Sequence, residues 1–335
     1  MKQEKQEKQE AEDLRGILKK FCDIDLKHLD GLKFEKLHAN SFVLDYITDG
    51  GIPFGAITQF YGPPSIGKST LSYWIMQEAQ RKNLQCLVVD SEGSLTSEYV
   101  KALGVDPKKV FVIRDVHMHK VMRAVALAVR KGTKFVIIDS ISALLPGNVA
   151  ECEEEERKAA IGEHARELTR LLPMLLHEVI QNNAICIVIN QIRHLVDVKN
   201  PYLKGKTYIT GGNALMHYST LNIELRLEDE DKGVKILSAK VTKNKAGLPQ
   251  REGLVKLVLG RGIDLAYDIF TFFEMKGLIE HKGAWIAHQG QTYRKFDMID
   301  YIEKHLDYFR TKCTEIMQGK KISENLFKNL KTESE

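Results

Sequence analysis

Residues 57–70, ITQFYGPPSIGKST, decide the fold. The stretch opens with a short apolar, β-branched run that is typical of a buried strand. Residues 62–69 then match the pattern G-x-x-x-x-G-K-[ST], in which glycines let backbone N–H groups turn toward a triphosphate at the start of a helix. In this pattern Lys68 neutralises the outer phosphates and Ser69 holds Mg²⁺. The alternative is an ordinary glycine turn, which the strand before the loop and the helix after it disfavour.

Outward from this loop, apolar runs alternate with helical patterns. CLVVD, FVIID and AICIVIN are interspersed with helical patterns at residues 69–82, 118–131 and 162–182. Uniformly apolar strands between helices predict an α/β fold with a mostly parallel, twisted sheet covered by helices on both faces. After Thr220 the apolar period becomes two, which predicts antiparallel strands that extend the same sheet. Pro173 predicts a kink or a break in the third helix.

The pattern along the chain indicates four parts. Residues 1–36 hold a polar K-Q-E repeat and a short helical arm, and residues 37–264 carry the α/β core. Residues 265–318 are expected to form a small α+β domain, with helices at 267–275 and 296–317 and a hairpin at GAWIAHQGQTY. The mixed charges of residues 319–335 predict a flexible tail.

Composition excludes several classes of protein. The 335 residues are 43% hydrophobic and 28% charged, as in a globular protein. The net charge of +4 is too small for a strongly basic, histone-like protein that binds nucleic acid through its overall charge. The five cysteines are scattered without a C-x-x-C pair, which favours reduced thiols. No apolar run approaches ~18 residues, and the start resembles no signal peptide. We therefore expect a soluble, cytoplasmic protein that binds no membrane.

Three polar side chains follow predicted parallel strands. Asp139 ends FVIID, where a carboxylate can reach a metal through water. Glu92 follows CLVVD and is a candidate for orienting an attacking water, while Gln191 directly follows AICIVIN at the expected strand end and is a candidate sensor of the γ-phosphate. Each also has a plain alternative, because any parallel strand can end in a polar residue and a glutamate can simply cap a helix.

Residues 194–213 form a long predicted loop that mixes lysines, tyrosines and glycines. Bases interleaved with aromatic rings suit a phosphate backbone and unstacked nucleobases. The alternative is a solvated flexible loop, and the acidic run at residues 151–156 is read as solvated surface.

Together and in this order, these residues resemble the RecA recombinase family. The resemblance covers about residues 41–306 and is most specific in DGGIPFGAITQFYGPPSIGKST, VVDSEGSLTSEYVKALGVD, INQIR, TGGNALMHYST, KVTKNKAGLP and LIEHKGAW. It implies a homologous recombinase in DNA repair and the SOS response. Such a protein forms a helical filament on single-stranded DNA with ATP and Mg²⁺, pairs it with homologous double-stranded DNA, exchanges strands and hydrolyses ATP in response to DNA. The implied location is the cytoplasm with the nucleoid, or the host cytoplasm for a phage protein.

Two alternatives stay open. One is a RecA-like accessory protein that binds ATP without strand exchange, and the other is a hexameric RecA-type helicase. TGGNAL followed by KNK, together with the GAW segment, favours the recombinase.

The resemblance also assigns the nucleotide site. It implies that Ser69 and Asp139 hold Mg²⁺, that Glu92 orients the attacking water and that Gln191 senses the γ-phosphate. Lys243 and Lys245 match a pair that reaches across the subunit interface to the neighbour's ATP. The implied nucleotide-binding residues are Gly62, Pro63, Pro64, Ser65, Ile66, Gly67, Lys68, Ser69, Thr70, Tyr99 and Asp139.

The DNA-binding residues come from two loops, at about residues 148–164 and 193–212. The matching positions are Ile161, Gly162, Arg166, Arg193, His194, Leu195, Val196, Thr210, Gly211, Gly212 and Asn213. Arginines there would neutralise phosphates, and an apolar side chain would wedge between bases.

Several positions depart from the family pattern. Thr96 replaces an aspartate that faces the adenine and Leu259 replaces a tyrosine near it, which predicts relaxed nucleotide selectivity. Pro173 replaces a DNA-contacting arginine, and Val198 replaces a phenylalanine of the second loop. Tyr202 or Tyr208 is a candidate substitute for that ring. The departures suggest a divergent or phage-type relative.

Overall fold

The computed structural model describes residues 16, 18–22, 33–147, 160–194, 207–209, 213–282, 285–321, 326, 327 and 330. The chain divides into two compact units, Met1–Glu35 and Lys36–Glu335. In the first unit, Gly16 and residues 18–22 are helical, in agreement with the expected short helix. The second unit contains the sheet and the candidate site.

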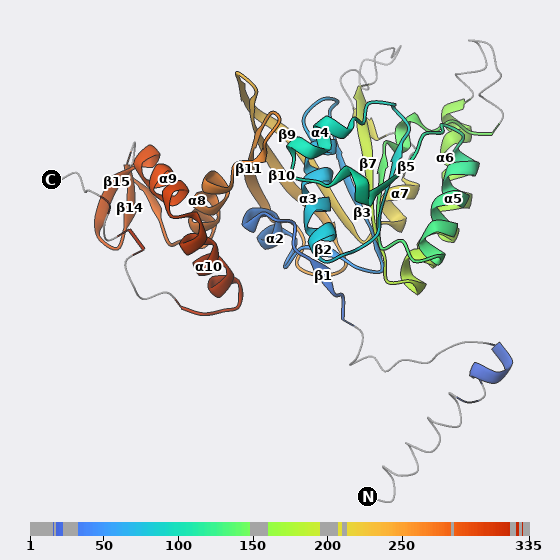
Figure 1. Ribbon diagram of the computed structural model, residues 1–335, viewed down its shortest axis with the longest axis horizontal. Coiled ribbons are helices and arrows are strands. Elements are labelled where there is room, and N and C mark those ends of the chain that lie inside the picture. Colours follow the sequence, from blue (N-terminus) through green and yellow to red (C-terminus); the bar gives the residue numbers. More distant parts are fainter. Residues whose placement is uncertain are drawn as a thin grey trace, which may run out of the picture. The chain divides into compact units, whose positions relative to one another are not determined.

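A ten-stranded sheet forms the centre of the second unit (Figure 1). Its order is β12-β11-β10-β9-β3-β7-β6-β4-β5, with β8 paired to β7. The strands from β9 to β5 in this order are parallel, and β10, β11 and β12 extend the sheet antiparallel, as predicted. The strands are β3 (Ala56–Gly62), β4 (Cys86–Asp90), β5 (Val110–Ile113), β6 (Phe135–Asp139), β7 (Ile185–His194), β8 (Thr207–Ile209), β9 (Leu221–Asp231), β10 (Val234–Asn244), β11 (Glu252–Val258) and β12 (Gly262–Ile263).

Helices cover both faces of this sheet (Figure 1). Because side chains alternate along a strand, Phe60 joins the core beneath one set of helices and Ile57 joins the core beneath the other. Helices therefore exclude water from both faces of the sheet, which explains the uniformly apolar strands and confirms the predicted fold class. The first set is α2 (Phe42–Ile47), α3 (Lys68–Arg81) and α4 (Ser97–Ala102), and the second is α5 (Met118–Arg130), α6 (Ala160–Gln181) and α7 (Ala214–Tyr218).

The expected break at Pro173 does not occur, because α6 runs through it without interruption. Proline removes the hydrogen bond to the carbonyl group of Thr169 one turn earlier. Both Pro173 and Thr169 lie on the exposed side of the helix, where water can bind that carbonyl group. The helix therefore tolerates the proline.

A smaller three-stranded antiparallel sheet and three helices follow the large sheet. The expected helix at residues 296–317 is instead two helices that meet at His305, and both pack against α8. A single straight helix would carry one of its ends away from α8, which is only 11 residues long. The elements are α8 (Leu265–Met275), β13 (Glu280–Lys282), β14 (Trp285–His288), β15 (Gln291–Arg294), α9 (Lys295–Lys304) and α10 (Leu306–Met317).

Two residues beyond α10 belong to the core of this smaller domain. Leu326 and Phe327 are buried, and the Phe327 ring lies 5.3 Å from the Phe309 ring and 6.1 Å from the Tyr293 ring between centroids. Both residues lie in the segment that the sequence analysis expected to be a flexible tail. Burial of a phenylalanine stabilises by about 1.5–3 kcal/mol, so the burial of Phe327 adds to the stability of the smaller domain.

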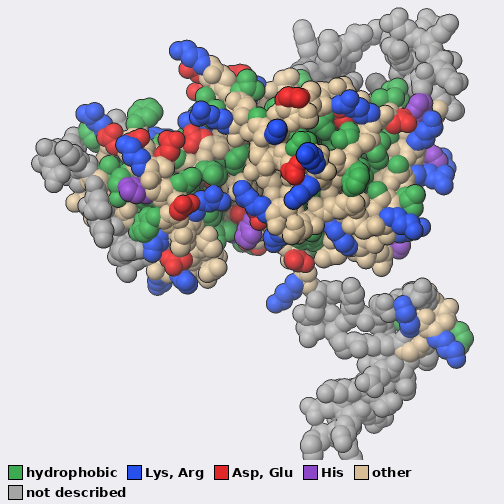
Figure 2. All heavy atoms as spheres, in the orientation of Figure 1, with side chains coloured by type: hydrophobic (Ala, Val, Ile, Leu, Met, Phe, Trp, Pro, Cys, Tyr) green, Lys and Arg blue, Asp and Glu red, His purple; other side chains and the backbone are tan. Residues whose placement is uncertain are grey.

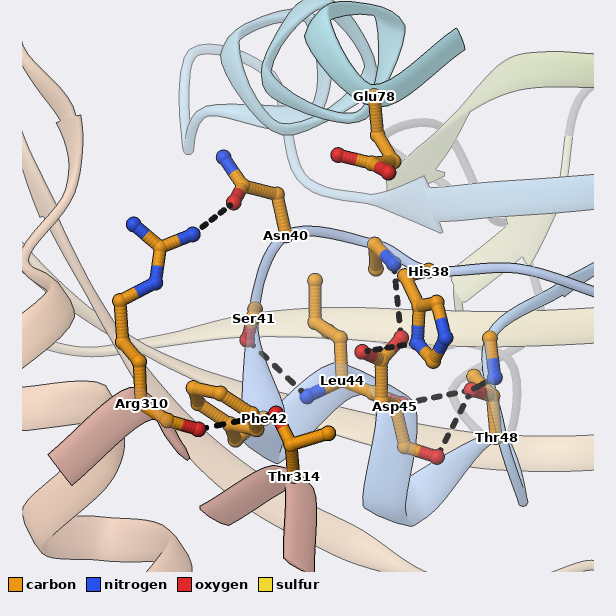
Figure 3. Close-up of polar contacts among 12 residues, drawn as sticks. His38, Asn40, Ser41, Phe42, Leu44, Asp45, Thr48, Glu78, Arg310 and Thr314 are labelled. Carbon is orange, nitrogen blue, oxygen red and sulfur yellow. Dashed lines mark hydrogen bonds and ion pairs between the residues drawn. The ribbon is translucent and has the colours of Figure 1, made fainter. Parts of the chain in front are cut away.

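Apolar packing of α8 on α2 joins the smaller domain to the core, and polar contacts around the start of α2 add to it (Figure 3). The Ser41 hydroxyl accepts a hydrogen bond from the backbone N–H of Leu44, which caps α2, and donates one of 2.5 Å to the buried carboxylate of Asp268 on α8. The Arg310 guanidinium donates to the side-chain oxygen of Asn40 at 3.5 Å. Burial raises the pKa of Asp268 to about 7.

The surface carries no large field of one sign on the face that Figure 2 shows, where basic and acidic side chains are intermixed. This matches the small net charge of +4, so the expected DNA binding would depend on local elements. Among the residues that the structure describes, no helix combines the length and apolarity needed to cross a membrane.

Candidate nucleotide-binding site

A cavity of about 350 Å³ opens at the carboxyl ends of β3, β4 and β6, beside the middle of β7. Ligands of open α/β sheets bind at this edge, because the loops that follow parallel strands all emerge there. The cavity gathers most of the predicted nucleotide-site residues, namely Ser65, Gly67, Lys68, Ser69, Thr70, Glu92, Tyr99, Asp139 and Gln191.

The phosphate loop joins β3 to α3 in a conformation that requires glycine. Gly67, the N-cap of α3, has φ 110°, and a β-carbon at Gly62 would lie 2.3 Å from the carbonyl oxygen of Leu225. Gly67 also offers no capping side chain, so the first-turn N–H groups of the 14-residue helix α3 can bind an anion.

Lys68 is folded back on its own loop. Its ammonium group donates hydrogen bonds to the carbonyl oxygens of Gly62, at 3.1 Å, and Pro63, at 2.5 Å. Burial lowers the pKa of Lys68 to about 8, although the charges of Asp139 and Glu92 act in the opposite direction. The Lys68 ammonium group therefore lies against the phosphate loop. An anion bound in the loop would favour its protonated form.

Glu92 is held by two donors from neighbouring strands. One oxygen of its carboxylate accepts hydrogen bonds from the Gln191 side-chain amide, at 3.0 Å, and from the Ser140 hydroxyl, at 2.7 Å. Gln191 lies on β7, and Ser140 directly follows β6. The structure thus joins the two predicted residues Glu92 and Gln191 by a direct bond. Sequence reasoning missed Ser140, whose one signal was its place directly after Asp139.

Asp139 lines the cavity and is almost fully buried. Burial raises the pKa of this carboxyl group, while hydrogen bonds from Ser69 and from the Tyr73 hydroxyl, the latter at 2.9 Å, lower it. Sequence reasoning also missed Tyr73, which lies one helical turn after Ser69.

The oxygen donors around Asp139 suit Mg²⁺. A hydroxyl and a carboxylate at the end of a phosphate loop are hard ligands, and Mg²⁺ usually completes its shell with phosphate oxygens and water. No group of three or more His, Cys, Asp or Glu side chains that could hold a metal occurs among the described residues. The residues present therefore fit an ion that arrives with a nucleotide rather than one held in an all-protein cage.

Tyr99, Leu259 and Gly260 also line the cavity. The Tyr99 hydroxyl is hydrogen-bonded to the Thr70 hydroxyl at 2.5 Å, and the Leu259 side chain is 78% exposed. Thr96 does not line this cavity. Its hydroxyl caps α4 by accepting a hydrogen bond from the backbone N–H of Tyr99 at 3.2 Å.

Comparison with known proteins agrees with this site. The family described as RecA N-terminal domain matches residues 9–264. The chain is 32% identical over 288 residues to Protein RecA of Thermus aquaticus, which covers 82% of this chain and 83% of the relative. It is 32% identical over 249 residues to Protein RecA of Ectopseudomonas oleovorans, with 72% and 70% covered. The chain belongs to the RecA family. The predicted class, a DNA-dependent P-loop ATPase of recombination, is thereby confirmed.

The predicted trans lysines of this RecA-family protein lie far from its own phosphate loop. The backbone N–H of Lys245 bonds to the Thr220 carbonyl, and the N–H of Thr220 bonds to the Ile57 carbonyl near the start of β3. The phosphate loop follows the other end of β3, about 16 Å away at the usual rise per residue. The Lys243 ammonium donates to the carbonyl oxygens of Met216, at 2.5 Å, and His217, at 3.0 Å.

The predicted DNA-binding residues are described in part. Gly162 and Arg166 are exposed on the first turns of α6, which begins at Ala160, so the end of the first predicted loop is helical. Asn213 is exposed at the start of α7. Only the backbone of Ile161, Arg193 and His194 is described, and Leu195, Val196, Thr210, Gly211 and Gly212 lie outside the described residues.

The second predicted loop has a β-hairpin stem. β7 continues past Gln191 to His194 and pairs antiparallel with β8, with Arg193 opposite Tyr208. Gln191 therefore lies inside β7, whereas the sequence analysis expected it at the end of a strand. The same strand carries the residue that touches Glu92 and leads directly into the predicted DNA-binding segment.

Proposed function

We propose that this protein assembles with ATP and Mg²⁺ into a helical filament on single-stranded DNA, pairs the bound strand with homologous duplex and exchanges the strands. The observation that carries the proposal is the Glu92–Gln191 hydrogen bond. It links the residue proposed to orient the attacking water with the strand that leads into the second predicted DNA-binding segment. A protein that only binds ATP has no need for that link.

Each residue of the site has a proposed task. The loop from Gly62 to Thr70 binds the phosphates through its backbone N–H groups, and Lys68 neutralises their charge. Ser69 and Asp139 hold Mg²⁺, which supplies charge stabilisation at the transferred phosphoryl group when bound. Glu92 orients the attacking water, and the Tyr99 ring stacks on the base.

Gln191 couples these tasks to DNA. Its amide donates to Glu92 in the structure, and a γ-phosphate would offer it a more strongly charged acceptor. Transfer of that hydrogen bond to the phosphate would free the Glu92 oxygen for water and shift the β7–β8 hairpin. DNA bound to the hairpin would favour the same shift, so DNA would stimulate hydrolysis.

The proposal is tested by imaging the protein with single-stranded DNA and a non-hydrolysable ATP analogue. We expect helical filaments that require both ligands. Closed rings would instead favour the helicase, and a protein that stays monomeric with both ligands would contradict the proposal. ATP turnover with and without single-stranded DNA, followed by a joint-molecule assay, distinguishes the recombinase from an accessory protein.

Nucleotide binding is expected to weaken as the pH rises above about 8, the pKa of Lys68 in the free protein. Bound phosphates stabilise the ammonium form, so the complex keeps a proton that the free protein loses. The affinity for ADP should then fall by up to about tenfold per pH unit. Calorimetry at pH 9 in two buffers of different ionisation enthalpy should detect proton uptake on binding.

The control for this titration is Lys68→Arg, because a guanidinium stays protonated throughout the range. Its ADP affinity should change little between pH 7.5 and pH 9.5, with both values chosen to bracket roughly the Lys68 pKa. Equal slopes for the wild type and Lys68→Arg would show that Lys68 does not control the pH dependence.

A further inference from the structure

The hairpin between β9 and β10 forms one wall of the nucleotide cavity. Its two-residue turn places Lys232 at φ 45° and Gly233 at φ 82°, the left-handed conformations that a tight hairpin turn requires. The Gly233 carbonyl accepts a hydrogen bond from the backbone N–H of Leu259 at 2.8 Å, which ties the tip of the hairpin to another residue that lines the cavity. Glu230, Gly233 and Lys235 all line the cavity.

Lys235 connects this hairpin to the phosphate loop. Its ammonium group donates a hydrogen bond of 2.7 Å to the backbone carbonyl of Ser65. It also lies 3.2 Å from the carboxylate of Glu230, directly opposite in the strand register. Ser65 has φ 60°, a left-handed conformation that serine seldom adopts, so the contact with Lys235 stabilises an unfavourable part of the loop.

Lys235 offsets part of the negative charge of the cavity. Among the described residues that line it, Lys68 and Lys235 are the cations, while Glu92, Asp139 and Glu230 are the anions. The lining alone is therefore acidic by one charge. A nucleotide triphosphate is strongly anionic, and repulsion from uncompensated carboxylates within a few ångströms would weaken its binding.

We propose that Lys235 is a positioning residue for nucleotide binding, which holds the phosphate loop in its binding conformation through the Ser65 carbonyl and provides the second positive charge of the cavity. This inference rests on the proposed function only in that the cavity binds a nucleotide. Glu230 keeps the Lys235 side chain aimed at the loop. The sequence contains no local sign of this role, because 170 residues separate Lys235 from Ser65.

The test is a titration of the full-length protein with a fluorescent ADP, without DNA. Lys235→Ala should raise the Kd by about tenfold, and the KM for ATP in the DNA-stimulated reaction should rise in parallel while kcat changes by less than about twofold. Lys235→Arg should restore most of the affinity, because it keeps both the charge and a donor for the carbonyl. The matched control is Lys240→Ala, on the same strand outside the cavity, which should bind like the wild type.

Lys235→Met is the second variant, since it keeps the length and apolar stem of the side chain and removes only the charged donor. It should bind as weakly as Lys235→Ala and show the same thermal unfolding temperature as the wild type without nucleotide. A Kd within about twofold of the wild type for both variants, or a fall in kcat with an unchanged Kd, would overturn the role of Lys235. A wild-type protein that binds no fluorescent ADP would instead overturn the proposed nucleotide site itself.

Discussion

Glu92→Gln should lower the rate of DNA-stimulated ATP hydrolysis by about 100-fold or more and leave ATP binding nearly unchanged. The amide keeps the size of the side chain and an oxygen acceptor for Gln191 and Ser140, but it cannot accept a proton from water. The loss should therefore appear in kcat. The measurement is steady-state turnover with saturating single-stranded DNA, alongside the Kd for a fluorescent ATP analogue.

Two further variants show whether the effect belongs to the position of the Glu92 carboxylate. Ser140→Ala removes one of its two donors and should give a smaller loss than Glu92→Gln. Glu228→Gln changes an exposed carboxylate on β9 and should behave like the wild type. Full turnover by Glu92→Gln would rule out Glu92 as the residue that activates water.

Lys245→Ala should lower the rate of DNA-stimulated ATP hydrolysis by about 100-fold or more, while each subunit still binds ATP. Lys245 lies near the start of β3, whereas the phosphate loop follows the other end of this strand, so we expect Lys245 to reach a nucleotide across a subunit interface. A cation supplied in this way stabilises the charge that develops on the transferred phosphate only when subunits are stacked. Lys243→Ala should have a similar effect, with an added loss of stability because Lys243 holds the carbonyl groups at the end of α7.

Mixing two inactive variants separates action in trans from action in cis. A Lys245→Ala subunit keeps its own Glu92, and a Glu92→Gln neighbour supplies an intact Lys245. In an equal mixture, roughly a quarter of the interfaces should combine both and recover turnover, if assembly is random along a head-to-tail filament. Recovery near zero would show that Lys245 acts within its own subunit or not at all. The control variant is Lys240→Ala, whose rate of ATP turnover should match that of the wild type.

The parts of the site that could be predicted are those that a short, contiguous stretch of sequence specifies. The phosphate loop is a contiguous pattern, and Glu92 and Asp139 follow buried strands whose carboxyl ends must meet at one edge of a parallel sheet. The same reasoning located Gln191, although it did not foresee that β7 continues to His194 as the stem of a hairpin. That continuation depends on pairing with β8, whose residues are more than ten positions away along the chain.

The remaining differences come from contacts that no local pattern contains. The break at His305 is set by packing of both helices on α8, and the burial of Phe327 is set by the rings that surround it. Thr96 was compared with an aspartate that faces a base, yet its hydroxyl serves as a helix cap. A short polar side chain before a helix satisfies the nearest free backbone N–H group, and that local bond decides its direction.

The amino-acid sequence alone determined the family, the α/β class and the identity of the phosphate loop, because hydrophobic period and glycine spacing act over a few residues. Tertiary structure alone decided which side chains meet: Gln191 with Glu92 across 99 positions, and Lys235 with Ser65 across 170. The physical reason is that a hydrogen bond depends on distances of about 3 Å between atoms, and such distances between remote segments are set only when the sheet brings its strands into register.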